Sequence, residues 1–205
     1  MTIRLHRGDL PNLSAYKGAV AIDTETMGLD PNRDRLCVVQ LSPGNGDGDV
    51  VQIAAGQTKA PNIEKLLADK SILKIFHYAR FDLGMLAKAF GVMAEPVYCT
   101  KIASRLARTY TDKHGLKDLT REVLGIDLSK QQQLSDWGAD ALSDSQVAYA
   151  ATDVLHLHTL KEKLDAMLAR ENRAELAAAC FRFLPDRARL DLAGWAAQDI
   201  FSHSV

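Results

Sequence analysis

Two acidic residues, Asp23 and Glu25, stand one position apart in the segment GAVAIDTET (residues 18–26). This segment is rich in β-forming residues, and alternate side chains of a strand leave the same face of the sheet, so we expect the two carboxylates side by side. Adjacent carboxylates repel each other unless a cation lies between them, and hard divalent ions such as Mg²⁺ and Mn²⁺ take oxygen ligands. A solvent-facing pair on an edge strand is the alternative, but the apolar run AVAI favours a central strand, where unpaired carboxylates are costly.

Two further acids and a tyrosine extend this pattern. Tyr149 and Asp153 are four residues apart in a segment with helical periodicity, so the phenol and the carboxylate project from one face of a helix. Asp82 follows the apolar run ILKIF and the segment HYAR, near the start of a helix, where alone it would complement the helix dipole. Each acid has an ordinary structural explanation by itself. The ordered set Asp-x-Glu, Asp and Tyr-x-x-x-Asp predicts a metal-dependent site.

Short β-rich and helical segments must position these residues. Sequential strands with short links are expected at residues 18–26, 36–42 (LCVVQLS) and 49–54 (DVVQIA), which indicates an antiparallel meander. Beyond Pro61 the expected elements are a helix at 63–69, a strand at 72–76, a helix at about 81–90 and a short strand near Val97. A meander followed by this alternation predicts an α/β fold, in which a mixed sheet of antiparallel and parallel strands is flanked by helices.

The remaining sequence is mostly helical. Apolar residues recur at helical spacing from about Ser143 to Arg170, which predicts one long helix carrying Tyr149 and Asp153. We divide the chain into a catalytic domain, residues 1–170, and a C-terminal helical extension, residues 171–205. The extension contains more large apolar and aromatic residues than a solvated tail would, together with several arginines, which favours an oligomer interface. Packing back onto its own domain is the alternative.

Composition restricts the class of protein. Of 205 residues, 47% are hydrophobic and 25% are charged, which is typical of one globular domain with an appended element and excludes a disordered scaffold. The three scattered cysteines match neither a disulfide framework nor a zinc motif. No segment has the apolar length of a membrane span, and residues 1–13 lack the pattern of a secretory signal. We therefore expect a cytoplasmic protein with no membrane partner.

Charge restricts how nucleic acid could bind. The net charge is −1, which excludes attachment to long duplexes through a broad positive field. A local basic face is expected where Lys101, Arg105 and Arg108 recur at i, i+4 and i+7 of a helix. A solvated helix face is the alternative for this patch.

At this point the sequence resembles a known family. AIDTET, FHYARFD and YAATD resemble the three motifs of the DEDD superfamily of 3′-5′ exonucleases, in the subgroup with Tyr in the third motif. GLKDLTREVLGIDLSK and QLSDWGADALSDSQVAYAATDVLHL are similar to the ribonuclease D branch, and the likeness covers about residues 15–168. The resemblance implies a ribonuclease H-like exonuclease fold. It also implies release of nucleoside monophosphates from the 3′ end of RNA or DNA with two divalent ions, Mg²⁺ or Mn²⁺.

The resemblance also implies a role for each member of the ordered set. Asp23 would bridge both ions, and Glu25 and Asp153 would complete the ion that activates water. Asp82 would hold the second ion through coordinated waters. Tyr149 would orient the attacking water, because a phenol with its usual pKa of about 10 is a positioning group more readily than a base.

One motif also resembles that of oligoribonucleases. DTETMGLDP is similar to their first motif, D-x-E-x-T-G-L-D-P, with Met27 in place of Thr and with Leu29 at the Leu that wedges against the bases of a very short substrate. An ordinary apolar turn residue is the alternative for Leu29. A short ribonuclease D-like chain with this feature resembles the nanoRNase C group. That likeness implies degradation of dinucleotides and a ring-shaped homo-oligomer, with an octamer as the candidate assembly.

Several other residues are candidates for contact with substrate. His77 precedes Asp82 by five positions, and a polar residue at the end of a strand is its alternative reading. Ser104, Arg105 and Arg108 are candidates for receiving a 5′ phosphate through hydrogen bonds and charge. The His77 assignment and the 5′-phosphate assignment depend on where the fold places these side chains.

Three functions remain at this stage. The first is a 3′-5′ exoribonuclease acting on very short RNA. The second has the same chemistry but trims the 3′ ends of longer RNA or degrades single-stranded DNA. The third is a non-catalytic nucleic-acid-binding module, whose sequence sign would be loss of a metal-binding acid. Because the acids and the tyrosine of the ordered set are all present, the sequence favours an enzyme.

Overall fold

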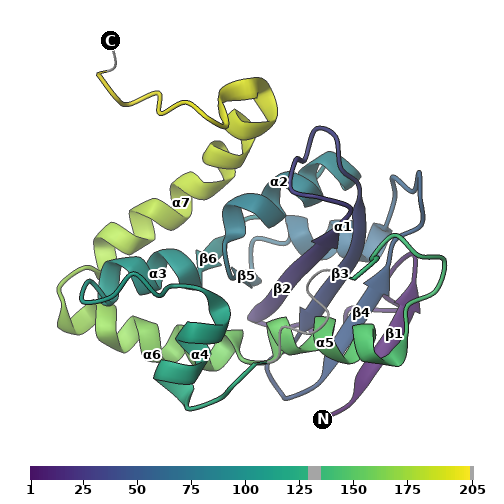
Figure 1. Ribbon diagram of the computed structural model, residues 1–205, viewed down its shortest axis with the longest axis horizontal. Helices are drawn as coiled ribbons and strands as arrows, with labels where there is room; N and C mark the ends of the chain where they lie inside the picture. The colour runs from purple at the N-terminus through teal and green to yellow at the C-terminus, as the bar shows by residue number, and fades with distance from the viewer. Residues whose placement is uncertain (129–134, 204–205) are drawn as a thin grey trace.

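The computed structural model describes residues 1–128 and 135–203. Residues 129–134, which fall within the stretch similar to ribonuclease D, lie outside the described residues. The described strands form a mixed sheet in the order β1-β4-β3-β2-β5-β6 (Figure 1). The strands are β1 (Ile3–Arg7), β2 (Ala19–Thr26), β3 (Leu36–Ser42), β4 (Gly48–Gln52), β5 (Leu73–Phe76) and β6 (Val97–Cys99).

The predicted meander is confirmed. Strand β3 pairs antiparallel with both β2 and β4, and β5 and β6 then add to β2 in parallel. This places β2, the strand of Asp23 and Glu25, between β3 and β5 inside the sheet. The sequence missed β1, which pairs in parallel with β4 at the edge. Its residues IRLHR alternate apolar with basic side chains and carry none of the apolar run that marked the central strands.

Helices cover both faces of the sheet. They are α1 (Pro61–Ala68), α2 (Ala79–Phe90), α3 (Thr100–Ala107), α4 (Leu116–Leu124), α5 (Asp144–Leu155), α6 (Leu157–Arg170) and α7 (Ala174–Leu190). Helix α5 packs against β1 to β4, where it shares a small core with Val38, Val50 and Trp137. The main core, on the other side of these strands, takes in Val39 and Val51 together with apolar residues of α1 and α2. The alternation of Val38 with Val39 therefore separates two cores, as expected for a strand covered on both faces.

The prediction of one helix from Ser143 to Arg170 is wrong. The helical backbone breaks at His156, with φ −105° and ψ −5°, and α6 continues from Leu157. The break coincides with a change of packing partner, because α5 lies on β1 to β4 whereas α6 packs against α3, α4 and β5. Buried apolar residues flank the break on both sides, Val154 before it and Leu157 and Leu160 after it. The apolar periodicity of the sequence therefore continues across the break and gives no sign of it.

The C-terminal extension packs partly onto its own domain. Helix α7 contacts α2, α3 and β6, and the ring of Phe181 lies 4.4 Å from that of Tyr98. A π-helical turn, Asp191–Trp195, follows it. Beyond α7, Trp195, Ile200 and Phe201 remain exposed. Within residues 1–128 and 135–203, every helix is too short or too polar to cross a lipid bilayer.

Candidate active site and metal centre

Strand β2 carries two carboxylates past the end of its parallel neighbour. It pairs with β5 only from Ala19 to Ala21, whereas its pairing with β3 continues to Thr26. Asp23 and Glu25 therefore lie beyond the carboxyl end of β5, where the sheet opens on one side. Ligand sites in α/β folds gather at this end of parallel strands.

Helix α5 brings the third carboxylate to the same place. One oxygen each of Asp23, Glu25 and Asp153 lies within 4.8 Å of the others. Tyr149, one turn before Asp153, points into the same cavity, and its ring packs against Trp137 at a centroid distance of 6.2 Å. The predicted juxtaposition of the first and third motifs is therefore present in the structure.

Asp82 reaches the site from the first turn of α2. Its side chain is buried and accepts a 2.7 Å hydrogen bond from the hydroxyl of Thr24, the residue between Asp23 and Glu25. It stands outside the group of three whose oxygens lie within 4.8 Å. This geometry agrees with a role in which Asp82 acts at a greater distance from the cluster, as the resemblance implies.

Burial and mutual repulsion disfavour the ionised form of these acids. Burial raises the pKa of Glu25 to about 8, and the charges of Asp153 and Asp82 add to the shift. The pKa of the Asp23 carboxyl is likewise raised well above its usual range, chiefly by burial and then by Asp82, Asp153 and Glu25. Burial also raises the pKa of Asp82 and of Asp153. Without a cation the site is electrostatically unfavourable in its charged form.

The donor set fits a hard divalent ion. Three carboxylates from β2 and α5 offer oxygen atoms close enough to share one ion, and Asp82 supplies further negative charge nearby. Bound divalent ions would supply Lewis-acid activation of water and stabilise charge on a leaving oxygen. Burial and the neighbouring carboxylates raise the pKa of Tyr149 above its usual range, so its hydroxyl keeps its proton at neutral pH and can orient a water.

A cavity of about 310 Å³ opens over these residues. His77 lines it, with its Nδ1 2.9 Å from the hydroxyl of Thr100, and burial together with Lys101 lowers its pKa to about 3. An imidazole that stays neutral at physiological pH can donate or accept a hydrogen bond but brings no charge. The cavity also contains Lys101, which the sequence placed on a candidate basic face, and Lys117 of α4.

The structure separates the three candidates for a 5′ phosphate. Arg108 is fully buried, where its guanidinium pairs with Glu122 and donates to the hydroxyl of Ser104 at 2.8 Å. Ser104 is buried as well and hydrogen-bonds to His114. Neither side chain has surface to offer a phosphate in this conformation, so the predicted basic face ends at Arg105. The reason is tertiary, because α4 brings Glu122 over the end of α3.

Met27 and Leu29 lie on the loop after β2 and are 56% and 83% exposed. Both side chains are available to an incoming ligand, although neither lines the cavity over the carboxylates. Arg105 is exposed on α3 and lines a different cavity.

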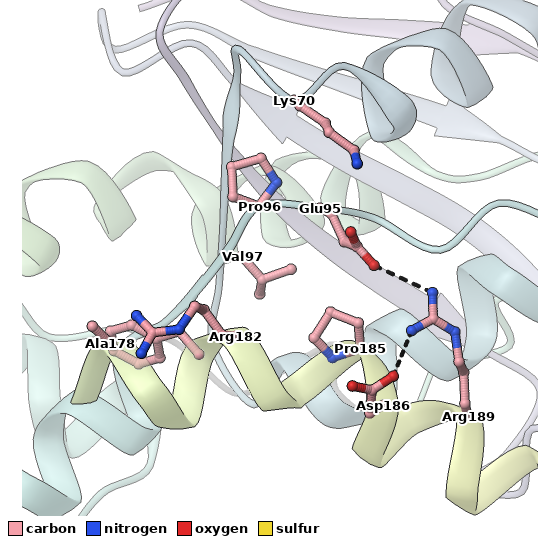
Figure 2. Close-up of a pocket in the computed structure, with 10 residues that line it drawn as sticks. Lys70, Glu95, Pro96, Val97, Ala178, Arg182, Pro185, Asp186 and Arg189 are labelled. Carbon is pink, nitrogen blue, oxygen red and sulfur yellow. Dashed lines mark hydrogen bonds and ion pairs between the residues drawn. The ribbon is translucent and has the colours of Figure 1, made fainter. Parts of the chain in front are cut away.

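A larger cavity, of about 510 Å³, shares no lining residue with the cavity over the carboxylates (Figure 2). It is formed by α7 and the segment leading into β6, and an ion-pair network of Glu95, Arg189 and Asp186 crosses one end of it. It contains none of the clustered carboxylates. Cavity volume alone would therefore select a site that lacks the clustered carboxylates.

The mixed sheet that gathers four carboxylates and a tyrosine at its open end has the ribonuclease H-like exonuclease fold. The family model described as 3′-5′ exonuclease matches residues 9–169. Ribonuclease D of Gluconacetobacter diazotrophicus is 36% identical over 174 residues, which are 82% of this chain and 42% of that protein. The chain thus spans less than half the length of the curated relatives it matches.

Solved structures extend the match to the whole chain. NrnC of Brucella melitensis with bound Mg²⁺ is 62% identical, with a TM-score of 0.97 and complete coverage of both chains. The same protein bound to pGG is 63% identical. Ribonuclease D of Escherichia coli, 26% identical with a TM-score of 0.75, covers 84% of this chain and 45% of its own. The chain belongs to the 3′-5′ exonuclease family, in the ribonuclease D branch and its NrnC group.

Proposed function

We propose that this protein is a metal-dependent 3′-5′ exoribonuclease that hydrolyses very short RNAs, dinucleotides included, to nucleoside 5′-monophosphates. The observation that carries the proposal is the cluster of Asp23, Glu25 and Asp153 beside Tyr149 at the floor of a cavity of only about 310 Å³. Clustered carboxylates beside a positioned phenol support metal-dependent hydrolysis of a terminal phosphodiester. Full-length similarity to NrnC, whose structure holds pGG, supports the same substrate class.

The proposed chemistry distributes roles among the chain's own residues. Asp23, Glu25 and Asp153 hold the divalent ions, with Asp82 completing the negative charge of the site. Tyr149 orients the attacking water through its protonated hydroxyl. Leu29 and Met27, exposed on the loop after β2, contact the bases of the very short substrate. His77, neutral and fixed by Thr100, contacts the sugar or phosphate near the scissile bond.

The alternative is 3′-end trimming of longer RNA or digestion of single-stranded DNA, because the catalytic residues treat the last phosphodiester alike whatever lies upstream. Initial rates on 5′-labelled RNAs of two to about ten nucleotides, and on DNAs of the same lengths, separate the two. We expect the highest kcat/KM for the dinucleotide. Rates that rise with length, or that are equal for DNA, would favour the alternative, and no Mg²⁺- or Mn²⁺-dependent hydrolysis of any of them would contradict an exonuclease.

We also infer that copies of this chain assemble into a homo-oligomer through the extension, residues 171–205. Its helix α7 already buries Phe181 and Leu184 within the protomer, so the inference depends on the apolar residues that stay exposed. Among the described residues of this segment, the exposed large apolar side chains are those of Leu176, Phe183, Trp195, Ile200 and Phe201. Apolar surface concentrated in one segment is typical of an interaction site.

A further inference from the structure

Gln40 of β3 is a fully buried polar residue to which the proposed chemistry gives no role. In the register of the sheet it lies directly opposite Asp23 of β2. The side chains of directly opposed residues leave the same face of an antiparallel pair, with their Cβ atoms about 5 Å apart. On the other side of β2, pairing with β5 ends at Ala21. Gln40 is therefore the cross-strand neighbour of Asp23, on the face where α5 brings in Asp153.

The side-chain amide of Gln40 has no partner within the protein. Neither its Nε2 nor its Oε1 makes a hydrogen bond to any of the described residues. A buried polar group left unpaired costs about 1–3 kcal/mol, and such groups are rare enough that each needs an explanation.

The surroundings of Gln40 would accept an apolar side chain. Val50, directly opposite Gln40 on β4, and Val38, two positions earlier on β3, belong to the small apolar core beneath α5. Helix α5 packs against β2, β3 and β4 on this face (Figure 1). An amide in this place is therefore not explained by packing.

Asp23 has the complementary shortage. Its carboxylate accepts a hydrogen bond from the backbone of Thr24, but among the described residues no side chain donates to it. Asp82, by contrast, accepts a hydrogen bond from the Thr24 hydroxyl. Carboxylates that ligate a metal ion are normally held by hydrogen bonds from residues behind them, and loss of such a partner costs about 10- to 100-fold in metal affinity or activity. A donor without an acceptor thus faces a carboxylate without a side-chain donor.

We propose that Gln40 is a positioning residue of the metal centre, whose Nε2 donates a hydrogen bond to the Asp23 carboxylate when the site binds its divalent ions. A neutral amide suits this role, because it adds a donor without adding a positive charge that would repel the ions. The inference rests on the proposed function and deepens it, since it names a residue that orients a metal ligand from within the sheet.

Gln52 of β4 offers a matched control. It is buried on the same face of the sheet, two positions beyond Val50, and it lies opposite Val38 instead of an acid. Its Nε2 donates a 2.8 Å hydrogen bond to the carbonyl of Ala139. The two glutamines therefore share residue type, burial and face, but only Gln40 is the neighbour of a metal-binding carboxylate.

Gln40→Met and Gln52→Met remove the amide and keep an unbranched side chain of similar length. Each is compared with wild type by calorimetric titration with Mn²⁺ and by thermal unfolding in EDTA. We expect Gln40→Met to bind Mn²⁺ about tenfold or more weakly. Its Tm in EDTA should stay level or rise, because the lost amide has no partner within the protein. Gln52→Met should show the reverse, a lower Tm in EDTA and an affinity for Mn²⁺ within about twofold of wild type.

Several results would overturn the proposal. Wild-type affinity for Mn²⁺ in Gln40→Met would make Gln40 a structural residue, and equal losses of affinity in both variants would show that pairing with Asp23 is not the cause. Gln40→Leu repeats the comparison with a branched side chain, and failure of both Gln40 variants to fold would show that the amide is required by the fold itself.

Hydrolysis of a dinucleotide in Mg²⁺ is measured separately on the same proteins. We expect Gln40→Met to lower kcat with little change in KM, because Gln40 acts through a metal ligand and does not touch the substrate. A wild type that binds Mn²⁺ without hydrolysing RNA would contradict the proposed function and leave the binding comparison standing. A wild type that binds no Mn²⁺ would overturn the proposed function and this inference together.

Discussion

Asp23, Glu25 and Asp153 each carry an electrostatic cost, because burial disfavours each of them as a carboxylate in the absence of a cation. We predict that Asp153→Asn and Glu25→Gln each abolish Mg²⁺-dependent hydrolysis while the fold stays intact. Each amide keeps the shape of the side chain and removes a charge that holds an ion. It also relieves repulsion, so the Tm in EDTA should stay level or rise. Turnover near that of wild type with unchanged metal dependence would remove the residue from the site.

Substitution of Tyr149 distinguishes a residue that orients the attacking water from one that binds the substrate. Tyr149→Phe keeps the ring that packs against Trp137 and removes only the hydroxyl. We expect kcat to fall by about 10²-fold, the usual contribution of a positioned proton-transfer or orienting group, with little change in substrate affinity. Steady-state kinetics with a dinucleotide provides the measurement. A large rise in KM at unaltered kcat would make Tyr149 a binding residue instead.

Leu29 is 83% exposed beside the site, so its removal should not disturb the core. We predict that Leu29→Ala harms cleavage of a dinucleotide more than cleavage of a longer RNA, because a two-nucleotide substrate has few other contacts from which to gain orientation. The ratio of kcat/KM for the two substrates is the readout. Equal losses at both lengths would contradict a wedge and would leave the nuclease assignment unaffected.

The sequence predicted that the acidic residues lie close together, but it did not predict that tertiary packing buries Arg108. Alternation on a strand and spacing on a helix place Asp23 with Glu25 and Tyr149 with Asp153, and both relations are local. Arg108 sits on the same helical face as Arg105 by spacing, but Glu122 of α4 covers it. A helix that arrives from another part of the chain leaves no sign in the spacing of α3.

At the scale of elements, the edge strand β1 has the weakest hydrophobic pattern of the strands in the sheet. A buried acid of β4 attaches it to the sheet. Asp49 accepts hydrogen bonds from Arg4 at 2.7 Å and from the hydroxyl of Tyr16 at 2.6 Å, and it contacts His6 Nε2 at 2.7 Å. These contacts tie β1 and the loop after it to the sheet. Hydrophobic patterning cannot reveal such an attachment, because the residues that make it are polar.

We predict that Asp49→Asn destabilises the protein by about 2 kcal/mol at neutral pH, since it leaves buried donors imperfectly paired. The pKa of the Asp49 carboxyl in the folded wild type is about 2, below its usual value, because the hydrogen bonds from Arg4, Tyr16 and His6 together outweigh the effect of burial. For an acid with a depressed pKa, the stabilisation is complete above the unfolded-state pKa of about 4 and is lost as the pH falls toward 2.

Thermal unfolding of wild type and Asp49→Asn at pH 7 and at pH 3 measures this contribution. The difference in Tm between the two proteins should be smaller at pH 3. Asp186→Asn, which removes an exposed acid paired with Arg189 on α7, is the control and should cost little at either pH. A difference that is the same at both pH values would show that Asp49 acts by packing alone.

Helices α5 and α6 are separate elements although the apolar periodicity of their sequence is continuous. One apolar periodicity runs from α5 into α6, because both helices bury the same kind of face, and the break at His156 arises where their packing partners change. For α7, the sequence predicted that its apolar residues are buried but did not identify the residues against which they pack. Tyr98 lies on β6, more than seventy residues earlier in the chain, and it takes up the ring of Phe181.

At the scale of the whole molecule, the exposed end of the extension bears on assembly. Deleting everything after Arg170 would remove Phe181, Leu184 and Ala188 from the core, so the shortened chain should unfold. Trp195 and Ile200 are each 43% exposed, and Phe201 is 74% exposed. Substitutions at these positions change the surface without opening the core, and they are the sharper test of an interface.

We predict that wild type is a homo-oligomer at micromolar concentration and that Trp195→Ala combined with Ile200→Asp dissociates it, because the pair removes apolar area and introduces charge at the surface proposed to be shared. Light scattering gives the mass, and an unchanged Tm shows that the protomer still folds. Leu5→Asp, at a leucine of β1 that is also 43% exposed, should leave the mass unchanged. If assembly encloses the sites, the dissociated variant should lose part of its preference for dinucleotides over longer RNA. A monomeric wild type would contradict the interface, and a dissociated variant with unaltered length preference would assign substrate selection to the protomer alone.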